Sequence, residues 1–273
     1  MVAHLGQRFG VSERRACRLV GQPRSTQRRR PTLVPGDEHL RKRLRALSRD
    51  HQRWGYRKQH TLLCREGWRI NRKRVRRVWR EEGLQVRRRR RRRRAGSRVP
   101  GHQAASHPNH TWAMDYAFDE TAGGRRLKIL NVTDEFTREA LACVPARSID
   151  AKQTVAVLAE LSADRGAPRY VRCDNGPEFV GHALKRWCRS SGARTSFIEP
   201  GAPWQNAFVE SFNGRMREEL LNLEVFDSLV EAAVLIEDWR VEYNTYRPHR
   251  SLRMLTPAEF AAHWKQENEA RLS

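Results

Sequence analysis

The chain has 273 residues and a formal net charge of +23, enough length for one large domain or two modest ones. No stretch approaches the roughly 20 apolar residues of a membrane-spanning helix, and the N-terminus lacks the apolar segment and cleavage site of a signal peptide. These absences exclude an obvious membrane or secreted protein, so we expect a soluble, cytoplasmic one.

The positive charge is concentrated in the first 110 residues. They hold 33 Lys and Arg against 7 Asp and Glu, a net charge of +26, whereas residues 111–273 hold 21 against 24, a net charge of −3. A segment this basic is attracted to polyanions, with nucleic acid as the first candidate and an anionic membrane as the second.

The five cysteines are scattered along the chain, with no Cys-x-x-Cys pair among them. This pattern indicates neither a disulfide framework nor a thiolate zinc site. We expect small, buried hydrophobic residues in a reducing compartment. The residues are Cys17, Cys64, Cys143, Cys173 and Cys188.

Residues 1–86 read as a helical DNA-binding region. Residues 12–20 begin with a serine suited to cap a helix and end before a glycine, which predicts the second half of a small helical unit. Residues 38–49 predict an amphipathic helix whose exterior is cationic. Its apolar face carries Leu40, Leu44 and Leu47.

Three short helices between about 38 and 84, with a glycine-containing turn before the last, indicate a helix-turn-helix. Asn71 opens the last helix, which ends before Gly83. Basic side chains that project from this helix could reach phosphates and base edges in a major groove, although a solvated basic face is the alternative. They are Arg72, Lys73, Arg74, Arg76, Arg77 and Arg80.

An arginine-rich linker is predicted over residues 87–110. Eight consecutive arginines repel one another too strongly to pack, and Pro100 and Gly101 follow them. Such a run should bind the DNA backbone without sequence preference and with a steep salt dependence, unless it only reflects arginine-rich composition. The run consists of Arg87, Arg88, Arg89, Arg90, Arg91, Arg92, Arg93 and Arg94.

From residue 112 the pattern changes from helices to strands, and then to strands alternating with helices. Three antiparallel strands followed by strand, helix, strand, helix is the order of ribonuclease-H-like domains, an α/β class. We expect this core at 111–225 and a C-terminal helical extension at 226–273. The strands are predicted at 112–118, 126–132, 139–144, 170–173 and 195–198, and the helices at 150–163, 179–190, 205–221, 228–244 and 257–264.

Three carboxylates stand where this strand order would bring them together. Asp115 lies in the first strand, Asp174 ends the fourth and Glu210 lies on the following helix. Taken singly, Asp174 could shape a turn or cap a helix, and Glu210 could be an ordinary exposed carboxylate. Rival carboxylates nearby are Asp119, Asp134, Glu135 and Glu178. Of these, Asp134 and Glu135 are interpreted as turn residues and Glu178 as an early-helix residue.

The sequence around these carboxylates resembles the DDE transposases of the insertion sequence 3 family. The stretch from Asp174 to Phe179 reads Asp-Asn-Gly-Pro-Glu-Phe, and 35 residues separate Asp174 from Glu210, a spacing typical of that family and of retroviral integrase cores. The likeness covers nearly the whole chain. It extends to residues 38–84, 112–116, 128–138, 198–214, 243–249 and 255–260.

The resemblance implies DNA cleavage and strand transfer, with Asp115, Asp174 and Glu210 as catalytic residues and metal ligands. Two divalent ions roughly 3.5–4 Å apart would be held around one phosphodiester. Hard oxygen ligands suit Mg²⁺, with Mn²⁺ as a substitute. Arg217, two helical turns after Glu210, is expected to contact a DNA phosphate, since the family usually carries a basic residue there.

The resemblance also implies partners. DNA would include both the element ends and a target, and the pairing of two ends implies at least a dimer. In this family such a chain is commonly a second-frame product, so the full transposase would be a fusion with an upstream frame. Residues 1–20 would then be the end of that helical module.

Two other functions stay open from the residues alone. One is another ribonuclease-H-like nuclease, such as a resolvase or an RNase H. The other is a DNA-binding regulator that uses residues 1–94 while its core is inactive.

Overall fold

A computed structural model describes residues 1–28, 37–86, 104–174, 182–197 and 206–272. They form two compact units, residues 1–43 and 44–273. The eight arginines of the predicted linker lie outside the described residues. In the part of the chain that is described, no helix is long and apolar enough to cross a membrane.

The first unit is built of short helices around a small core. Ser12 accepts a hydrogen bond from the Arg15 amide at 3.4 Å, and Gly21 ends the second helix with φ at 68°. The predicted helix at 12–20 is therefore confirmed, and it follows another helix, as expected of a two-helix unit. The helices are α1 (Val2–Phe9), α2 (Glu13–Val20) and α3 (Arg24–Arg28), and the buried residues Val2, Ala16 and Cys17 form the core.

The helix-turn-helix pattern is confirmed in outline by the next three helices. Asn71 caps the last of them, because its side chain accepts a hydrogen bond from the Lys73 amide at 2.8 Å. Gly67, in the turn before it, has φ at 87°, a left-handed conformation that suits glycine. The helices are α4 (Glu38–Asp50), α5 (Tyr56–Arg65) and α6 (Arg72–Glu81).

A five-stranded mixed sheet carries the rest of the second unit. Its strand order is β3-β2-β1-β4-β5, with β1, β2 and β3 antiparallel and β4 and β5 parallel to β1. This is the order predicted for a ribonuclease-H-like domain. The strands are β1 (Thr111–Glu120), β2 (Arg126–Asp134), β3 (Ala140–Ala146), β4 (Tyr170–Cys173) and β5 (Arg194–Phe197).

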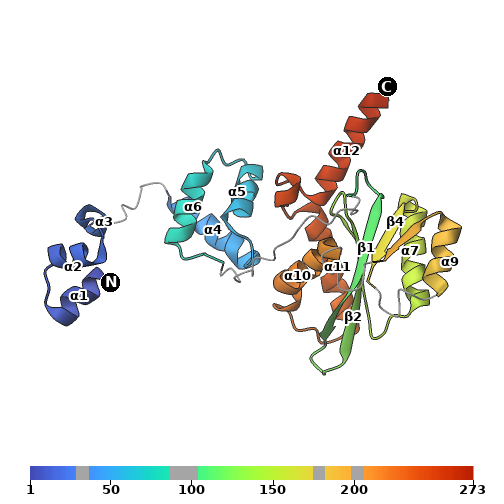
Figure 1. The fold of residues 1–273 in the computed structure, drawn as a ribbon, viewed down its shortest axis with the longest axis horizontal. Helices are drawn as coiled ribbons and strands as arrows, with labels where there is room; N and C mark the ends of the chain where they lie inside the picture. Colours follow the sequence, from blue (N-terminus) through green and yellow to red (C-terminus); the bar gives the residue numbers. More distant parts are fainter. Residues whose placement is uncertain (29–36, 87–103, 175–181, 198–205, 273) are drawn as a thin grey trace. The chain divides into compact units, whose positions relative to one another are not determined.

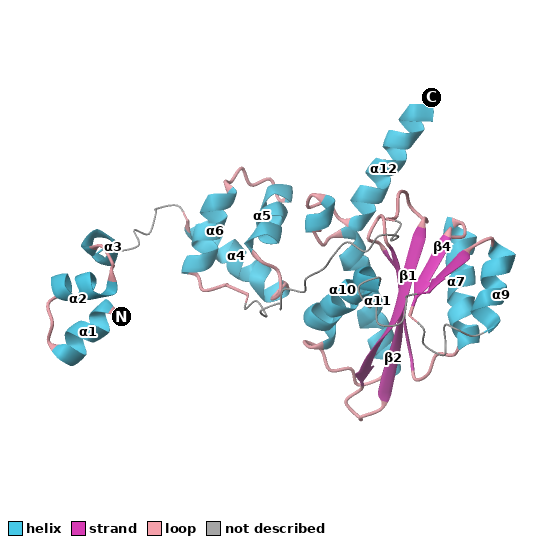
Figure 2. Cartoon of the chain, viewed as in Figure 1, coloured by secondary structure: helices cyan, strands magenta, loops and turns pink. Residues whose placement is uncertain are grey.

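Helices cover both faces of the sheet (Figure 1). Alternation along β1 explains why: Trp112 and Met114 belong to one core cluster, whereas Ala117 belongs to the other. Fully burying side chains such as Trp112 stabilises each layer by about 1.5–3 kcal/mol per residue. Figure 2 shows the strands between the helical layers, which are α7 (Ala151–Arg165) and α9 (His182–Ser191) on one face and α10 (Ala207–Met216), the π-helix η2 (Arg217–Leu221) and α11 (Leu229–Thr245) on the other.

Two helices differ from the sequence prediction. The single helix expected at 205–221 changes from α to π geometry at Arg217, a change that widens a turn and is frequent near functional sites. The short helix expected at 257–264 is α12 (Pro257–Leu272), after the 3-10 turn η3 (Arg250–Leu252). It runs on because residues 265–272 contain no helix breaker and include the Lys265–Glu269 pair at 3.9 Å.

A buried charge cluster links α5 to η2 and to the residues that follow α11. Arg247 donates two hydrogen bonds to the Glu219 carboxylate, at 2.7 and 2.6 Å, and Lys58 Nζ lies 3.6 Å from the same carboxylate. Burial alone would raise the pKa of Glu219, but Arg247 and Lys58 outweigh it and hold that pKa at about 2. Burial, together with repulsion from Arg247, lowers the pKa of Lys58 to about 7.

Candidate active site

Asp115 stands on β1, on the face of the sheet that α10 covers. Its side chain is half-buried and accepts a hydrogen bond from the Tyr116 amide at 2.8 Å. In the antiparallel ladder it is paired with Asn131 of β2. The ladder with β2 therefore fixes the backbone of Asp115, which is what a preorganised ligand requires.

Asp174 follows the last residue of β4. The parallel register pairs Ala113 with Arg172, so two residues further along each strand Asp115 stands level with Asp174. Carboxyl ends of parallel strands are common ligand sites in α/β folds. The residues that follow Asp174, 175–181, lie outside the described part of the chain.

Glu210 lies in the first turn of α10 and is exposed. The start of this helix is tied to β1, because Asn206 is buried and its Nδ2 donates to the Met114 carbonyl at 3.4 Å. Glu210 and Asn213 are three residues apart and so share one face of α10. That face is directed toward β1, as the contact of Asn213 with Asp115 shows.

The three carboxylates influence one another electrostatically. Burial, with the negative charges of Asp174 and Glu210, raises the pKa of Asp115 to about 6, although hydrogen bonds from Tyr116 and Asn213 oppose the rise. Like charges gathered in this way cost free energy unless a cation or a proton joins them. The arrangement is one that a positive ion would stabilise.

The donor chemistry suits a hard divalent cation, but a closed ligand set is not formed. Among the described residues, no group of three His, Cys, Asp or Glu side chains stands close enough together to hold a metal. Carboxylate oxygens are nevertheless the ligands that Mg²⁺ prefers. The residues present fit such an ion in chemistry and charge, and binding would have to draw the exposed Asp174 and Glu210 closer to Asp115.

Asn213 is a site residue that the sequence reasoning missed. Its Nδ2 donates to Asp115 Oδ2 at 2.9 Å, and its Oδ1 accepts from Asn131 Nδ2 at 2.7 Å. This chain of amides connects α10, β1 and β2 behind the carboxylate. The available signal was its place three residues after Glu210, on the same helical face.

Arg217 was expected to hold a DNA phosphate. Its side chain is exposed, and its Nη2 donates to the carbonyl of Phe118 in β1. It marks the point where α10 gives way to η2. A DNA contact by this guanidinium would therefore require the bond to Phe118 to be shared or exchanged.

Models of known protein families match the segments of the chain that hold the helix-turn-helix and the three carboxylates. Residues 105–203 and 191–257 match integrase core domains, and residues 35–92 match an HTH-like domain. The chain is 44% identical over 257 residues to the 39.2 kDa protein of insertion element IS476 from Xanthomonas euvesicatoria, covering 94% of this chain and 74% of that protein. It belongs to the integrase-core transposases of insertion elements.

A more distant relative, again a transposase, agrees with this membership in an integrase-core transposase family. The transposase for insertion sequence element IS629 from Shigella sonnei is 25% identical over 242 residues, covering 85% of this chain and 81% of that protein. The magnesium-bound catalytic core of HTLV-2 integrase is 19% identical with a TM-score of 0.47, covering 57% of this chain and 97% of that one.

The rival carboxylates of this transposase core have structural roles. Asp134 is buried and accepts hydrogen bonds from the amides of Phe136 and Thr137, as expected of a turn residue. Glu135 was also interpreted as a turn residue, but it forms a buried ion pair with Arg172 of β4. Its role is thus to hold the turn against the strand that ends at Asp174. Glu178 lies outside the described residues.

The predicted DNA-contact residues of α6 differ from one another in the structure. Arg77 donates to the Glu81 carboxylate at 2.9 and 3.1 Å, so its charge is compensated within the helix. Arg76 lies over the Tyr56 ring at 5.7 Å with its side chain exposed. The other exposed members are Arg72, Lys73, Arg74 and Arg80.

Most cysteines match the expectation. Cys17, Cys143, Cys173 and Cys188 are buried and Cys64 is exposed. Burial raises the pKa of the Cys188 thiol to about 11, which keeps it protonated and unreactive at neutral pH. The expectation of burial was wrong for Cys64, which lies 3.6 Å from His60 Nε2 on the surface of α5.

Proposed function

We propose that this chain is a DNA transposase that cuts DNA and joins the cut end to a second DNA by metal-dependent phosphoryl transfer. The observation that carries the proposal is the electrostatic effect of Asp174 and Glu210 on Asp115. The three carboxylates belong to a domain whose strand order is ribonuclease-H-like. Membership in the integrase-core transposase family and the helix-turn-helix segment support it.

Each carboxylate has a distinct task in this proposal. Asp115 is the rigid ligand, because β1, β2 and Asn213 fix it. Asp174 and Glu210 are exposed and complete the ligand set when DNA and metal are bound. Two Mg²⁺ ions, with Mn²⁺ as a substitute, would activate the attacking oxygen and stabilise the leaving one.

The protein itself binds and orients the DNA. The exposed cations of α6 and the arginines 87–94 bind phosphates, with Arg217 beside the carboxylates as a further contact. No side chain becomes covalently attached: water attacks in the cleavage step, and the 3′-hydroxyl it releases attacks in the joining step. The active assembly holds two element ends and is at least a dimer, and the chain acts with DNA-binding residues supplied by an upstream-frame fusion.

The test is cleavage and strand transfer on DNA that carries the element ends, with the chain alone and fused to the upstream frame. Asp174→Asn and Glu210→Gln should lose both reactions in Mg²⁺ while DNA binding is retained. Glu218→Gln, an exposed carboxylate eight residues after Glu210, is the matched control and should stay active. Activity that survives both substitutions would contradict the site, and DNA binding without any wild-type cleavage would favour a regulator.

A further inference from the structure

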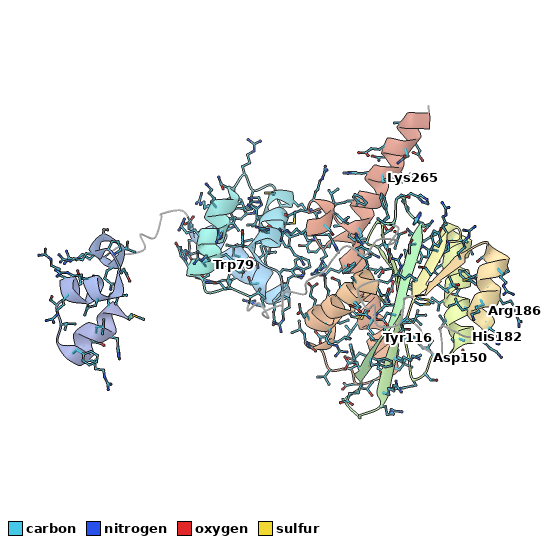
Figure 3. All side chains as sticks on the ribbon, in the orientation of Figure 1. Trp79, Tyr116, Asp150, His182, Arg186 and Lys265 are labelled. Carbon is cyan, nitrogen blue, oxygen red and sulfur yellow. The ribbon has the colours of Figure 1, made fainter. Side chains whose placement is uncertain are left out.

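One face of α9 carries a row of basic side chains. His182, Lys185, Arg186 and Arg189 follow the spacing i, i+3, i+4, i+7 and are all exposed. We name these four residues the basic stripe. Figure 3 labels His182 and Arg186 on the side of α9 that faces away from the sheet. The opposite face is buried against the sheet through Leu184, Trp187 and Cys188.

The basic stripe differs from the ion-paired arginines of the core, because none of its members has an ion-pair partner among the described residues. The adjacent helix α7 carries Glu160 and Asp164, which are exposed and make no ion pair with the stripe. Residues 182–194 hold four Lys and Arg and no acidic residue, within a half of the chain whose net charge is −3.

The positive surface continues beyond the helix. Arg194 opens the edge strand β5, and its amide donates to the Arg169 carbonyl at 2.9 Å. Both side chains are exposed. The helix α9 packs against β5, so the stripe and these two arginines border the same edge of the sheet.

The dimensions of the basic stripe fit a nucleic-acid backbone. Seven residues of helix rise about 10 Å, and successive phosphates of one DNA strand are about 3.4 Å apart along the duplex axis, so the stripe spans about three phosphates. Lys and Arg are the side chains that most often bond phosphate oxygens. A solvated charged face would have the same composition, and only a binding measurement separates the two.

The chemistry of the stripe favours DNA of unspecified sequence. Its Lys and Arg side chains bond phosphate oxygens whatever the sequence, and it contains no Asn or Gln, the side chains that pair with adenine edges. Element ends have a fixed sequence and need base contacts, whereas a target site is met in many sequences. The stripe also begins only eight residues after Asp174, on the segment that leads away from the carboxylates.

We propose that the basic stripe binds the sugar-phosphate backbone of target DNA during strand transfer, an inference that rests on the proposed transposase function. The stripe holds the incoming duplex beside the carboxylates, and α6 engages the element ends. Its loss should weaken the capture of target DNA and leave the recognition of the ends intact.

The test compares two double variants of the full chain. Lys185→Ala/Arg186→Ala removes two charges from the stripe, and Arg125→Ala/Arg250→Ala removes two exposed charges elsewhere in the core as the matched control. Three quantities are measured: cleavage of end DNA, transfer of a pre-cut end into plasmid, and metal-free affinity for a duplex of unrelated sequence across a salt series. Thermal unfolding of both variants checks that each folds.

The stripe variant should cleave ends at the wild-type rate but transfer them at least tenfold more slowly. Its logarithmic salt slope for unrelated duplex should be shallower than that of the control by about 1.8, or about 0.9 for each lost phosphate contact. Equal losses in cleavage and transfer would overturn the assignment to target DNA, and an unchanged affinity would overturn the stripe as a DNA surface. A wild-type chain that neither cuts nor joins would contradict the transposase function, and the duplex affinity would still test the stripe.

Discussion

Asn213 donates a hydrogen bond to Asp115 at 2.9 Å, from the helix that also carries Glu210. The same amide accepts from Asn131 at 2.7 Å, so one side chain fixes the orientation of the buried carboxylate against two strands. If Asp115 holds a metal as proposed, Asn213 is a positioning residue that acts on the reaction through Asp115.

Asn213→Ala should therefore reduce DNA cleavage about 10–100-fold, the usual cost of losing a partner that orients a metal ligand. The Mg²⁺ concentration for half-maximal rate should rise in the same variant, since a misoriented Asp115 binds the ion less well. Asn222→Ala, an exposed asparagine after η2, serves as the control. A lower rate with an unchanged Mg²⁺ dependence would contradict the positioning role.

The buried charge cluster predicts different effects on the free energy of unfolding when Glu219 is replaced and when Lys58 is replaced. Glu219→Gln should lower the free energy of unfolding by about 3–5 kcal/mol, because Arg247 would remain buried without a counter-charge. Lys58→Met should be close to neutral or stabilising, because Arg247 already pairs with Glu219 and burial lowers the Lys58 pKa to about 7. Chemical denaturation at pH 7 measures both, with Glu218→Gln as the exposed control. Equal losses in the two variants would contradict this division of roles.

The same carboxylate predicts an acid dependence. Glu219 has a folded-state pKa of about 2 against an unfolded value of 4.5, so its stabilisation is fully present above about pH 4.5 and is lost as the pH falls toward 2. In Glu219→Gln this part of the acid destabilisation should be missing. Unfolding free energies measured at several pH values between 2 and 5 would reveal this difference between wild type and variant. Parallel curves for the two proteins would count against the role of Glu219.

Within α6, the structure separates residues that the sequence treated alike. Arg72→Ala and Arg76→Ala should each make the salt slope of DNA binding shallower by about 0.9, since both side chains are exposed. Arg77→Ala should change it little, because Arg77 is already bonded to Glu81. Fluorescence anisotropy with labelled duplex across a salt series measures the slope of each variant. Three slopes equal to that of the wild type would argue against α6 as the DNA contact.

Deletion of residues 87–94 tests the arginine run. The truncated chain should bind unrelated DNA more weakly and with a flatter salt dependence, because the run would release several counterions on binding. Metal-dependent chemistry on a short, saturating substrate should be retained. An unchanged salt slope would remove this role from the arginines.

The sequence alone was sufficient to predict the sheet and the elements on which Asp115, Asp174 and Glu210 lie, while their catalytic role stays a prediction. Period-two alternation in β1 and β2, and the place of Asp174 at the end of β4, are local features. The partners of those residues were not predictable in the same way. The pairing of Glu135 with Arg172 and the contact of Arg217 with Phe118 join residues 37 and 99 positions apart, which no local period encodes.

The C-terminal boundary of α10 shows the same limit. Helix propensity continues through residues 217–221, yet η2 has π geometry there because its side chains are placed by tertiary partners, Phe118 for Arg217 and Arg247 for Glu219. Asn213 lay within a motif whose likeness was evident, but only its contact with Asp115 gives it a role.

The most direct test of the three-carboxylate site is a Mn²⁺ titration followed by electron paramagnetic resonance, with the full chain bound to end DNA. Wild type should bind Mn²⁺ at a site that is weakened in Asp115→Asn, Asp174→Asn and Glu210→Gln but unchanged in Glu218→Gln, and cleavage should be lost in the same three variants. Mn²⁺ binding that persists in all three, or cleavage that continues with the metal chelated, would contradict the account.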